Sequence, residues 1–281
     1  MTEHEAAPAA ASEPASRNLL LRVVAALVLA PVVIAIAYVG GVLWIAAATL
    51  VVIGLYVEWL AVTDTRDIRT VLCGAAGLVI AGIALAAGRI EIAFVVLAIS
   101  LIALALVAGN RRNWAAAGFV YAAAAEMSSV LLRLDAAKGF VALMFVLLVV
   151  WVTDIGGYFA GRSIGGPKLW ERVSPKKTWA GAIGSFVGSL LLAAGFAAFD
   201  LGRTGPLLLL AAVLSVVSQL GDLFESSVKR RFGVKDSSQI IPGHGGLLDR
   251  LDGFVAAVIV AAVIGFLRGG ADGVGRGLMV W

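Results

Sequence analysis

The sequence predicts an all-α, polytopic membrane protein with about nine transmembrane helices and a cytoplasmic N-terminus. Its 281 residues are 61% hydrophobic and only 14% charged, with a mean hydropathy of +0.99. Soluble domains carry roughly 25% charged residues, so this composition excludes that class. A helix needs about 20 apolar residues to cross a bilayer. The stretches that meet this need lie near residues 23–39, 42–60, 70–88, 92–108, 114–132, 138–160, 178–199, 205–222 and 253–268.

The spans account for almost the whole chain after residue 18. The sequence therefore predicts a short tail and one membrane domain. Residues 1–18 are rich in Ala, Glu, Pro and Ser, a composition typical of a disordered tail. Residues 19–281 then form a single integral-membrane domain. The one cysteine, Cys73, excludes an intramolecular disulfide. The net charge of +4 reflects lysines and arginines in the loops, so no nucleic-acid partner is expected.

The distribution of positive charge predicts the orientation. Loops rich in Lys and Arg stay in the cytoplasm. With the N-terminus inside, the inside segments hold 16 of the 22 lysines and arginines, and the outside segments hold 6. The two longest polar loops, 161–177 and 223–250, then share the cytoplasmic face, where nucleotides are found.

The eighth span ends in a polar stretch, and its helical pattern can continue to about Phe232. Asp222, Ser226 and Lys229 stand at i, i+4 and i+7, so they share one helix face. An acid, a hydroxyl and an ammonium in a row at the bilayer surface predict one wall of a polar cleft. The alternative is a solvated helix end with one local salt bridge.

The ninth span follows the turn Pro242-Gly-His-Gly-Gly246, whose glycines permit positive φ angles and close approach of the backbone. Asp249 and Asp252 come next, at i and i+3 on one face. Two carboxylates so close repel each other unless a cation lies between them, and Mg²⁺ prefers oxygen ligands. With Asp222 arriving from the neighbouring helix, the three acids predict a metal site. The alternative is that the acids only complement the helix dipole.

The second polar loop also suits phosphate. Ser174 and Pro175 predict the N-cap and the first helical residue of the seventh span. A helix N-terminus with Lys176 and Lys177 beside it is a phosphate-binding arrangement. The alternative is a capped helix whose lysines contact lipid headgroups.

Four further ionisable residues leave roles open. Asp154 lies in the sixth span, where an ionisable residue is costly and usually functional. His244 is a candidate acid or base, although a single histidine in a turn is more often a hydrogen-bonding loop residue. Glu58 and Glu126 lie in or beside spans, and the sequence connects them to no site.

The motif from residue 226 to 252 reads Ser-x-Val-Lys-Arg-x4-Lys-Asp-x-Ser-x2-Ile-Pro-x-His-Gly-Gly-Leu-x-Asp-Arg-Leu-Asp. It resembles the signature of the phosphatidate cytidylyltransferase (CDP-diacylglycerol synthase) family over 27 unbroken residues. The stretch Ser-Pro-Lys-Lys-Thr-Trp from residue 174 is similar to that family as well. One departure is Ala180, where the family usually has Glu, so no role is assigned to this position.

The resemblance implies transfer of a cytidylyl group from CTP to phosphatidic acid, which gives CDP-diacylglycerol and pyrophosphate. It implies Mg²⁺ as cofactor, with room for a second cation, an inner-membrane location and a homodimer. The residues expected to act in catalysis are Asp222, Asp249, Asp252 and Lys229, and the three aspartates are also the expected metal ligands. The residues expected to bind substrate are Ser174, Lys176, Lys177, Ser226, Arg230, Lys235 and His244.

Two other functions compete with this interpretation. The nearer is another membrane nucleotidyl- or phosphotransferase, such as a CTP-dependent polyprenol kinase. The sequence lacks the Asp-Gly-x2-Ala-Arg pattern of CDP-alcohol phosphotransferases. A transporter would need charges near the middle of the membrane, in broken helices. This chain gathers its charges at one face instead.

Overall fold

The computed structural model describes residues 15–109, 111–238 and 245–281, with the side chains of the first helix described from Leu27 onward. The helices are α1 (Ala15–Val39), α2 (Gly41–Val62), α3 (Ile68–Ala86), α4 (Ile90–Val107), α5 (Arg112–Leu134), α6 (Gly139–Ser163), α7 (Trp179–Ala198), α8 (Thr204–Arg231), α9 (Leu248–Gly269), the 3-10 turn η1 (Ala271–Gly273) and α10 (Val274–Met279). The strands are β1 (Lys168–Trp170) and β2 (Ser174–Thr178).

The prediction of an all-α polytopic membrane protein is confirmed. Within the described residues, the 8 helices from α2 to α9 are long and apolar enough to cross a bilayer. The predicted first span corresponds to α1, which begins at Ala15. Its part with described side chains, Leu27–Val39, is apolar but shorter than the other spans. The count of nine spans and the cytoplasmic N-terminus therefore stay predictions. Residues 1–14 of the predicted tail lie outside the described residues.

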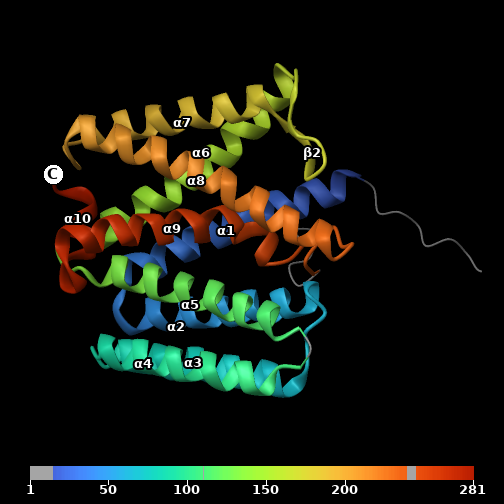
Figure 1. The fold of residues 1–281 in the computed structure, drawn as a ribbon. Coiled ribbons are helices and arrows are strands. Elements are labelled where there is room, and N and C mark those ends of the chain that lie inside the picture. Colours follow the sequence, from blue (N-terminus) through green and yellow to red (C-terminus); the bar gives the residue numbers. More distant parts are fainter. Residues whose placement is uncertain (1–14, 110, 239–244) are drawn as a thin grey trace, which may run out of the picture.

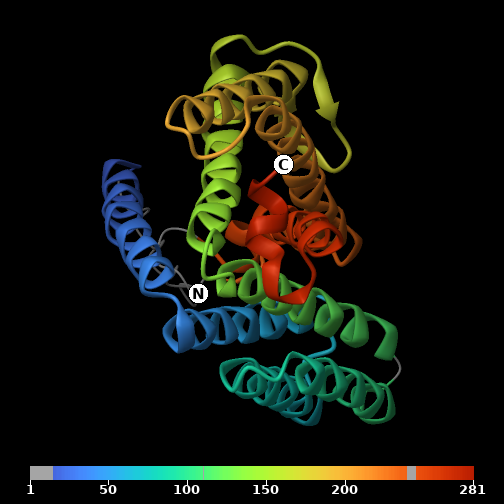
Figure 2. The same cartoon turned by 90° about the vertical axis from the view of Figure 1, so that its left-hand side faces the viewer.

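Most of the long helices run side by side in about the same direction, and α6 crosses them obliquely (Figure 1). Helices α3 and α4 form one side, α6, α7 and α8 form the other, and α9 packs between α8 and α5 (Figures 1 and 2). The contact between α6 and α7 is close because glycines face each other there. A Cβ on Gly156 would lie 3.0 Å from the carbonyl oxygen of Gly184. Small residues allow helices in a membrane to approach in this way.

The segment before α7 differs from its prediction. Residues Ser174–Thr178 form strand β2, which pairs antiparallel with β1, and α7 begins only at Trp179. The predicted N-cap at Ser174 and helix start at Pro175 were wrong. The cap is Thr178, whose hydroxyl accepts a hydrogen bond from the Gly181 N–H at 3.1 Å. The backbone of the residues before Thr178 pairs with β1 in the hairpin, so it is not free to start a helix. Pro175 is tolerated in β2 because both strands of a two-stranded sheet are edge strands.

The hairpin and the junction between α8 and α9 lie at the same end of the helices, which we call the hairpin end (Figure 1). The opposite end carries α10 and the C-terminus, and we call it the C-terminal end. Helix α8 has 28 residues and continues to Arg231, close to the predicted limit. The two longest polar loops therefore share one end of the molecule, as predicted.

Candidate active site

The polar face predicted on α8 is present and is joined to the hairpin. Ser226 Oγ donates a hydrogen bond to Asp222 Oδ1 at 3.3 Å. The other carboxylate oxygen of Asp222 lies 2.5 Å from Lys177 Nζ, on β2. Both side chains of this pair are about one third exposed, at 28% for Lys177 and 32% for Asp222. The hairpin and the end of α8 thus meet through an ion pair that solvent and a ligand can reach.

Lys229 is enclosed between two carboxylates. Its ammonium lies 2.6 Å from Glu225 Oε2, one turn earlier on α8, and 2.5 Å from Asp249 Oδ1, on α9. Its side chain is 12% exposed, and that of Glu225 is 2% exposed. A buried cation is costly unless its partners compensate the lost hydration. These contacts fix the distance between α8 and α9 at the hairpin end.

The second oxygen of Asp249 binds residues on both sides of the loop that precedes α9. Asp249 Oδ2 accepts hydrogen bonds from Ser237 N at 3.0 Å, Ser237 Oγ at 3.0 Å and Gly246 N at 3.1 Å. Gly245 has φ +84°, a conformation that favours glycine, and a Cβ there would lie 3.2 Å from Asp249 Oδ2. The prediction that this turn needs glycine for positive φ and close approach is confirmed at residue 245.

Asp252 lies one turn after Asp249 on α9, and it is half-buried as well. Its Oδ1 accepts a hydrogen bond from its neighbour Gly253 N at 2.7 Å. Three other carboxylates lie within electrostatic range of it, those of Asp154, Asp222 and Glu225. The Tyr121 hydroxyl, which is buried and has no hydrogen-bond partner among the described residues, is also in electrostatic range of Asp252 and Glu225. The unassigned Asp154 therefore belongs to the same cluster.

This acidic cluster consists of Asp154, Asp222, Glu225, Asp249 and Asp252. The cations that interact with it in the described residues are Lys177, Lys229 and Arg250. Arg250 comes directly after Asp249 on α9, and its side chain reaches electrostatic range of Asp154. The cluster thus has more carboxylates than cations, and Glu225 Oε1 is buried with no hydrogen-bond partner in the described part of the chain.

The cluster suits a divalent cation in its chemistry. Carboxylate oxygens are the ligands that Mg²⁺ prefers, and the surplus of acids leaves negative charge to neutralise. In the arrangement described, no three side chains of His, Cys, Asp or Glu among residues 15–109, 111–238 and 245–281 converge closely enough to hold one ion. Lysine ammonium groups lie next to Asp222 and Asp249 instead. A metal held by the three predicted aspartates requires at least one lysine to move aside.

Four of the other predicted substrate-binding residues lie on β2, at the end of α8 and in the loop after it. Lys176 is exposed on β2, and Ser174 is half-buried at the start of the same strand. Arg230 is exposed, and its Nη1 is 3.4 Å from the Val234 carbonyl oxygen. Lys235 is exposed in the loop after α8. His244 lies outside the described residues.

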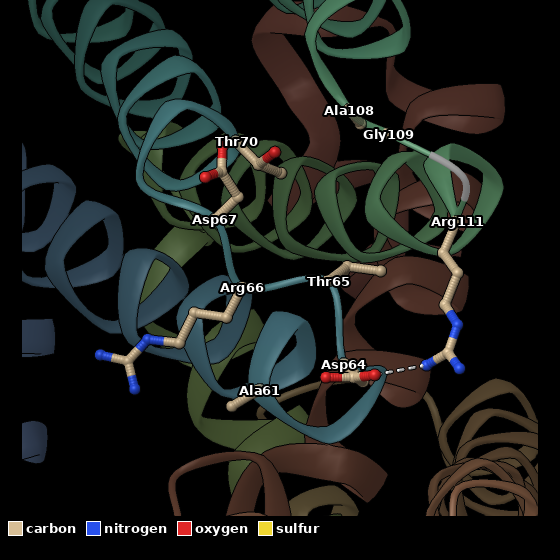
Figure 3. A pocket seen from close by; sticks show the side chains of 9 residues that line it. All are labelled: Ala61, Asp64, Thr65, Arg66, Asp67, Thr70, Ala108, Gly109 and Arg111. Atoms are coloured by element: carbon tan, nitrogen blue, oxygen red, sulfur yellow. Dashed lines mark hydrogen bonds and ion pairs between the residues drawn. The ribbon is translucent and has the colours of Figure 1, made fainter.

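A separate polar pocket of about 550 Å³ lies between the α2–α3 and α4–α5 connections (Figure 3). An ion pair of 3.0 Å joins Asp64 Oδ2 and Arg111 Nη1 at its edge. The lining residues are Ala61, Asp64, Thr65, Arg66, Asp67, Thr70, Ala108, Gly109 and Arg111. None of them was predicted to act in the reaction.

Sequence reasoning missed two acids of this end of the molecule. Glu225 stands four residues before Lys229, which is the spacing of a helical ion pair, so this signal was present in the sequence. Glu58 was noticed but connected to nothing. Its partners are about 180 residues away, as the separations of 179 to 190 residues in its hydrogen bonds show. No local pattern carries that information.

The sequence profile of the cytidylyltransferase family matches residues 20–267. The phosphatidate cytidylyltransferase of Brucella suis is 41% identical over 254 residues, which cover 88% of this chain and 93% of that protein. The enzymes of the same name from Haemophilus influenzae and Staphylococcus epidermidis are 47% identical over 131 residues and 50% identical over 115 residues. These shorter matches cover 44% and 40% of this chain, and 45% and 44% of the respective relatives. The chain therefore belongs to the cytidylyltransferase family.

Proposed function

We propose that this protein transfers the cytidylyl group of CTP to phosphatidic acid, which yields CDP-diacylglycerol and pyrophosphate for phospholipid synthesis. The observation that carries the proposal is the 41% identity to a phosphatidate cytidylyltransferase over 88% of the chain. The geometry supports it, because the acids of α8 and α9 meet Lys177 of the hairpin and Lys229 of α8 at one end of the membrane helices.

The reaction forms one bond and breaks another. A phosphate oxygen of phosphatidic acid attacks the α-phosphorus of CTP, and the bond from that phosphorus to the pyrophosphate oxygen breaks. The attacking oxygen is already anionic near neutral pH, so little help from a general base is needed. The obstacle is the repulsion between two polyanions. Preorganised cations and in-line positioning lower that barrier.

The cations of the site have distinct places in this proposal. Lys177 lies at the exposed contact between the hairpin and α8, where it can release Asp222 and bind a substrate phosphate. Lys229 is enclosed, and it holds Glu225 and Asp249 in position. Ser226, beside Asp222, adds a hydroxyl donor. The proposed outer phosphate contacts are Ser174, Lys176, Arg230, Lys235 and His244.

Mg²⁺ is proposed as the cofactor, with Asp222, Asp249 and Asp252 as its ligands. When bound, it would neutralise phosphate oxygens and stabilise the charge that develops in the transition state. The acid surplus of the cluster and the unpartnered Glu225 Oε1 support this assignment. A second cation beside Mg²⁺ stays part of the proposal, because the family resemblance implies it.

The active site is proposed to face the cytoplasm of a bacterial inner membrane, and the protein is proposed to form a homodimer. The charge asymmetry of the loops supports the orientation. A cysteine introduced at the exposed Lys176, in a Cys73→Ser background, should resist an impermeant thiol reagent in intact spheroplasts and react in inverted vesicles. Labelling in intact spheroplasts would contradict the orientation. Cross-linking in native membranes tests the dimer, and exclusively monomeric protein would contradict it.

The activity is tested with purified protein in detergent, labelled CTP, phosphatidic acid and Mg²⁺. We expect a CDP-lipid product, and we expect Asp249→Asn to lower kcat by on the order of 10²–10³-fold, as the loss of a preorganised charged group does. Asp67→Asn serves as the matched control, because Asp67 caps α3 outside the acidic cluster. Absence of CDP-lipid from the wild-type protein, or full activity of Asp249→Asn, would contradict the proposal.

A further inference from the structure

Glu58 is a buried acid on a helix that carries none of the motif residues. It lies near the hairpin end of α2, four residues before the last residue, Val62, and it is 2% exposed. None of the ion pairs among the described residues includes it. A buried carboxylate without a cation needs hydrogen-bond donors to replace its hydration. The residues that donate these hydrogen bonds show which parts of the chain Glu58 holds together.

The two oxygens of Glu58 accept four hydrogen bonds. Oε1 accepts from Ser238 Oγ at 2.7 Å and from Leu247 N at 2.9 Å. Oε2 accepts from Ser237 Oγ at 2.8 Å and from Leu248 N at 2.8 Å. The serines precede the stretch 239–244 and the leucines follow it. One carboxylate therefore ties together both ends of the loop between α8 and α9.

Glu58 also caps α9 from another helix. The N-cap residue of α9, Leu247, has no side chain that can accept a hydrogen bond from the first-turn N–H groups. Glu58 accepts from Leu247 N and Leu248 N in its place, and its negative charge lies next to the positive end of the helix dipole. The start of α9, and with it Asp249, is thereby held against α2.

A short chain of contacts leads from Glu58 to the acidic cluster. The Ser237 hydroxyl lies 2.8 Å from Glu58 Oε2 and 3.0 Å from Asp249 Oδ2, so its one proton is shared between two carboxylates. Asp249 in turn contacts Lys229. A Cβ at Gly246 would collide with both Ser237 Oγ and Glu58 Oε2, so the backbone fits around this arrangement only as glycine.

We propose that Glu58 is a positioning residue for the transferase. Through Ser237 and the first turn of α9 it sets the orientation of Asp249, and through Asp249 that of Lys229. The inference rests on the activity proposed above. Asp249 is a proposed metal ligand, and groups that orient a metal-binding side chain typically contribute about 10- to 100-fold to metal affinity or activity. Removal of the Glu58 charge should therefore slow the reaction without a change in substrate affinity.

The test uses Glu58→Gln in the full-length protein, with Glu126→Gln as the matched control. Glu126 is another buried glutamate, which accepts a hydrogen bond from Thr49 at 2.5 Å, and its Oε2 has no hydrogen-bond partner among the described residues, those of the loop included. We expect Glu58→Gln to lower kcat about 10- to 100-fold with an unchanged KM for CTP. Amide hydrogen exchange of residues 245–249 should rise in Glu58→Gln and stay unchanged in Glu126→Gln.

A second variant keeps the test decisive if Glu58→Gln folds poorly. Ser237→Ala removes only the shared hydroxyl, and it should lower kcat in the same direction. The double variant should be no worse than Glu58→Gln alone, because both residues act through Asp249. Wild-type kcat in Glu58→Gln, or additive effects in the double variant, would overturn the proposal. If the wild type makes no CDP-lipid, the proposed activity itself is contradicted. If amide hydrogen exchange of residues 245–249 is unchanged in Glu58→Gln, the proposed role of Glu58 is contradicted.

Discussion

The two ends of the helix bundle both bury acidic side chains, but they satisfy them differently. At the C-terminal end, Asp135 is 3% exposed, and each of its oxygens accepts two hydrogen bonds. The donors are Ala137 N, Lys138 N, Arg276 N and Arg276 Nε, at 2.8 to 3.0 Å. At the hairpin end, Glu225 pairs one oxygen with Lys229 and leaves the other without a partner among the described residues.

We interpret Asp135 as a structural contact and the acidic cluster as the part of the molecule that binds a ligand. Asp135 needs nothing more, and it ties the start of α6 to α10. Arg133 also connects helices nearby. Its guanidinium donates hydrogen bonds to the Ala37 and Tyr38 carbonyl oxygens, where α1 meets α2. The acidic cluster keeps a surplus of carboxylates, which costs stability unless a cation or a substrate completes it. The surplus of carboxylates thus lies at the end where the reaction is proposed, although Glu126 Oε2, on α5, is also buried without a hydrogen-bond partner among the described residues.

The largest effect is expected at Lys229. In Lys229→Met, Glu225 and Asp249 lose their shared cation while they remain buried. Breaking a buried ion pair from one side typically costs about 3–5 kcal/mol, so thermal unfolding in detergent should shift to much lower temperature and activity should be lost. Lys176→Met removes an exposed lysine and should leave the melting temperature unchanged. Equal melting temperatures of wild type and Lys229→Met would show that the lysine does not hold α8 and α9 together.

The sequence predicts the features that depend on neighbouring residues. Apolar length locates the spans, since each long apolar stretch must cross a bilayer. Helical spacing puts Asp222 and Ser226 on one face, and the structure confirms that contact. The motif places Asp249 beside the loop, and the glycine at 245 has the expected positive φ. Metal binding by the three aspartates stays a prediction.

The features that depend on distant contacts could not be predicted. The pairing of Ser174–Thr178 with β1 overrides a local helix-start pattern, because the alternative partner of its backbone lies in another segment. The partner of Asp222 is Lys177 across the hairpin contact, and that choice is set by how α7 and α8 pack. The contacts of Glu58 are the clearest example of what local sequence cannot predict. A buried acid in a span indicates importance, but only the fold brings it to the loop before α9.

A smaller effect is expected at Asp135, and it should not reach the reaction. Asp135→Asn keeps the side chain's size and loses the charge that pairs with Arg276, which is 55% exposed and regains water. A hydrogen bond to a charged group contributes about 1.5–3 kcal/mol, so the melting temperature should fall less than in Lys229→Met. With folded protein, kcat should equal that of the wild type. A loss of kcat in Asp135→Asn would show that the two ends are coupled.

The dependence of this effect on pH identifies the charge as its cause. Burial by itself raises the pKa of Asp135, but hydrogen bonds from the backbone of Arg276, Lys138 and Ala137 and from the Arg276 guanidinium outweigh it, so the pKa lies below its ordinary value. An aspartate in an unfolded chain titrates near pH 3.9, about its ordinary value. The stabilisation is therefore complete above roughly that pH and disappears as the pH falls through the lower pKa of the folded state. The difference in melting temperature between wild type and Asp135→Asn should stay constant from neutral pH down to about pH 5 and shrink in more acidic buffer. A difference that persists at the most acidic pH would mean that the substituted amide disturbs packing, and that the charge of Asp135 contributes nothing.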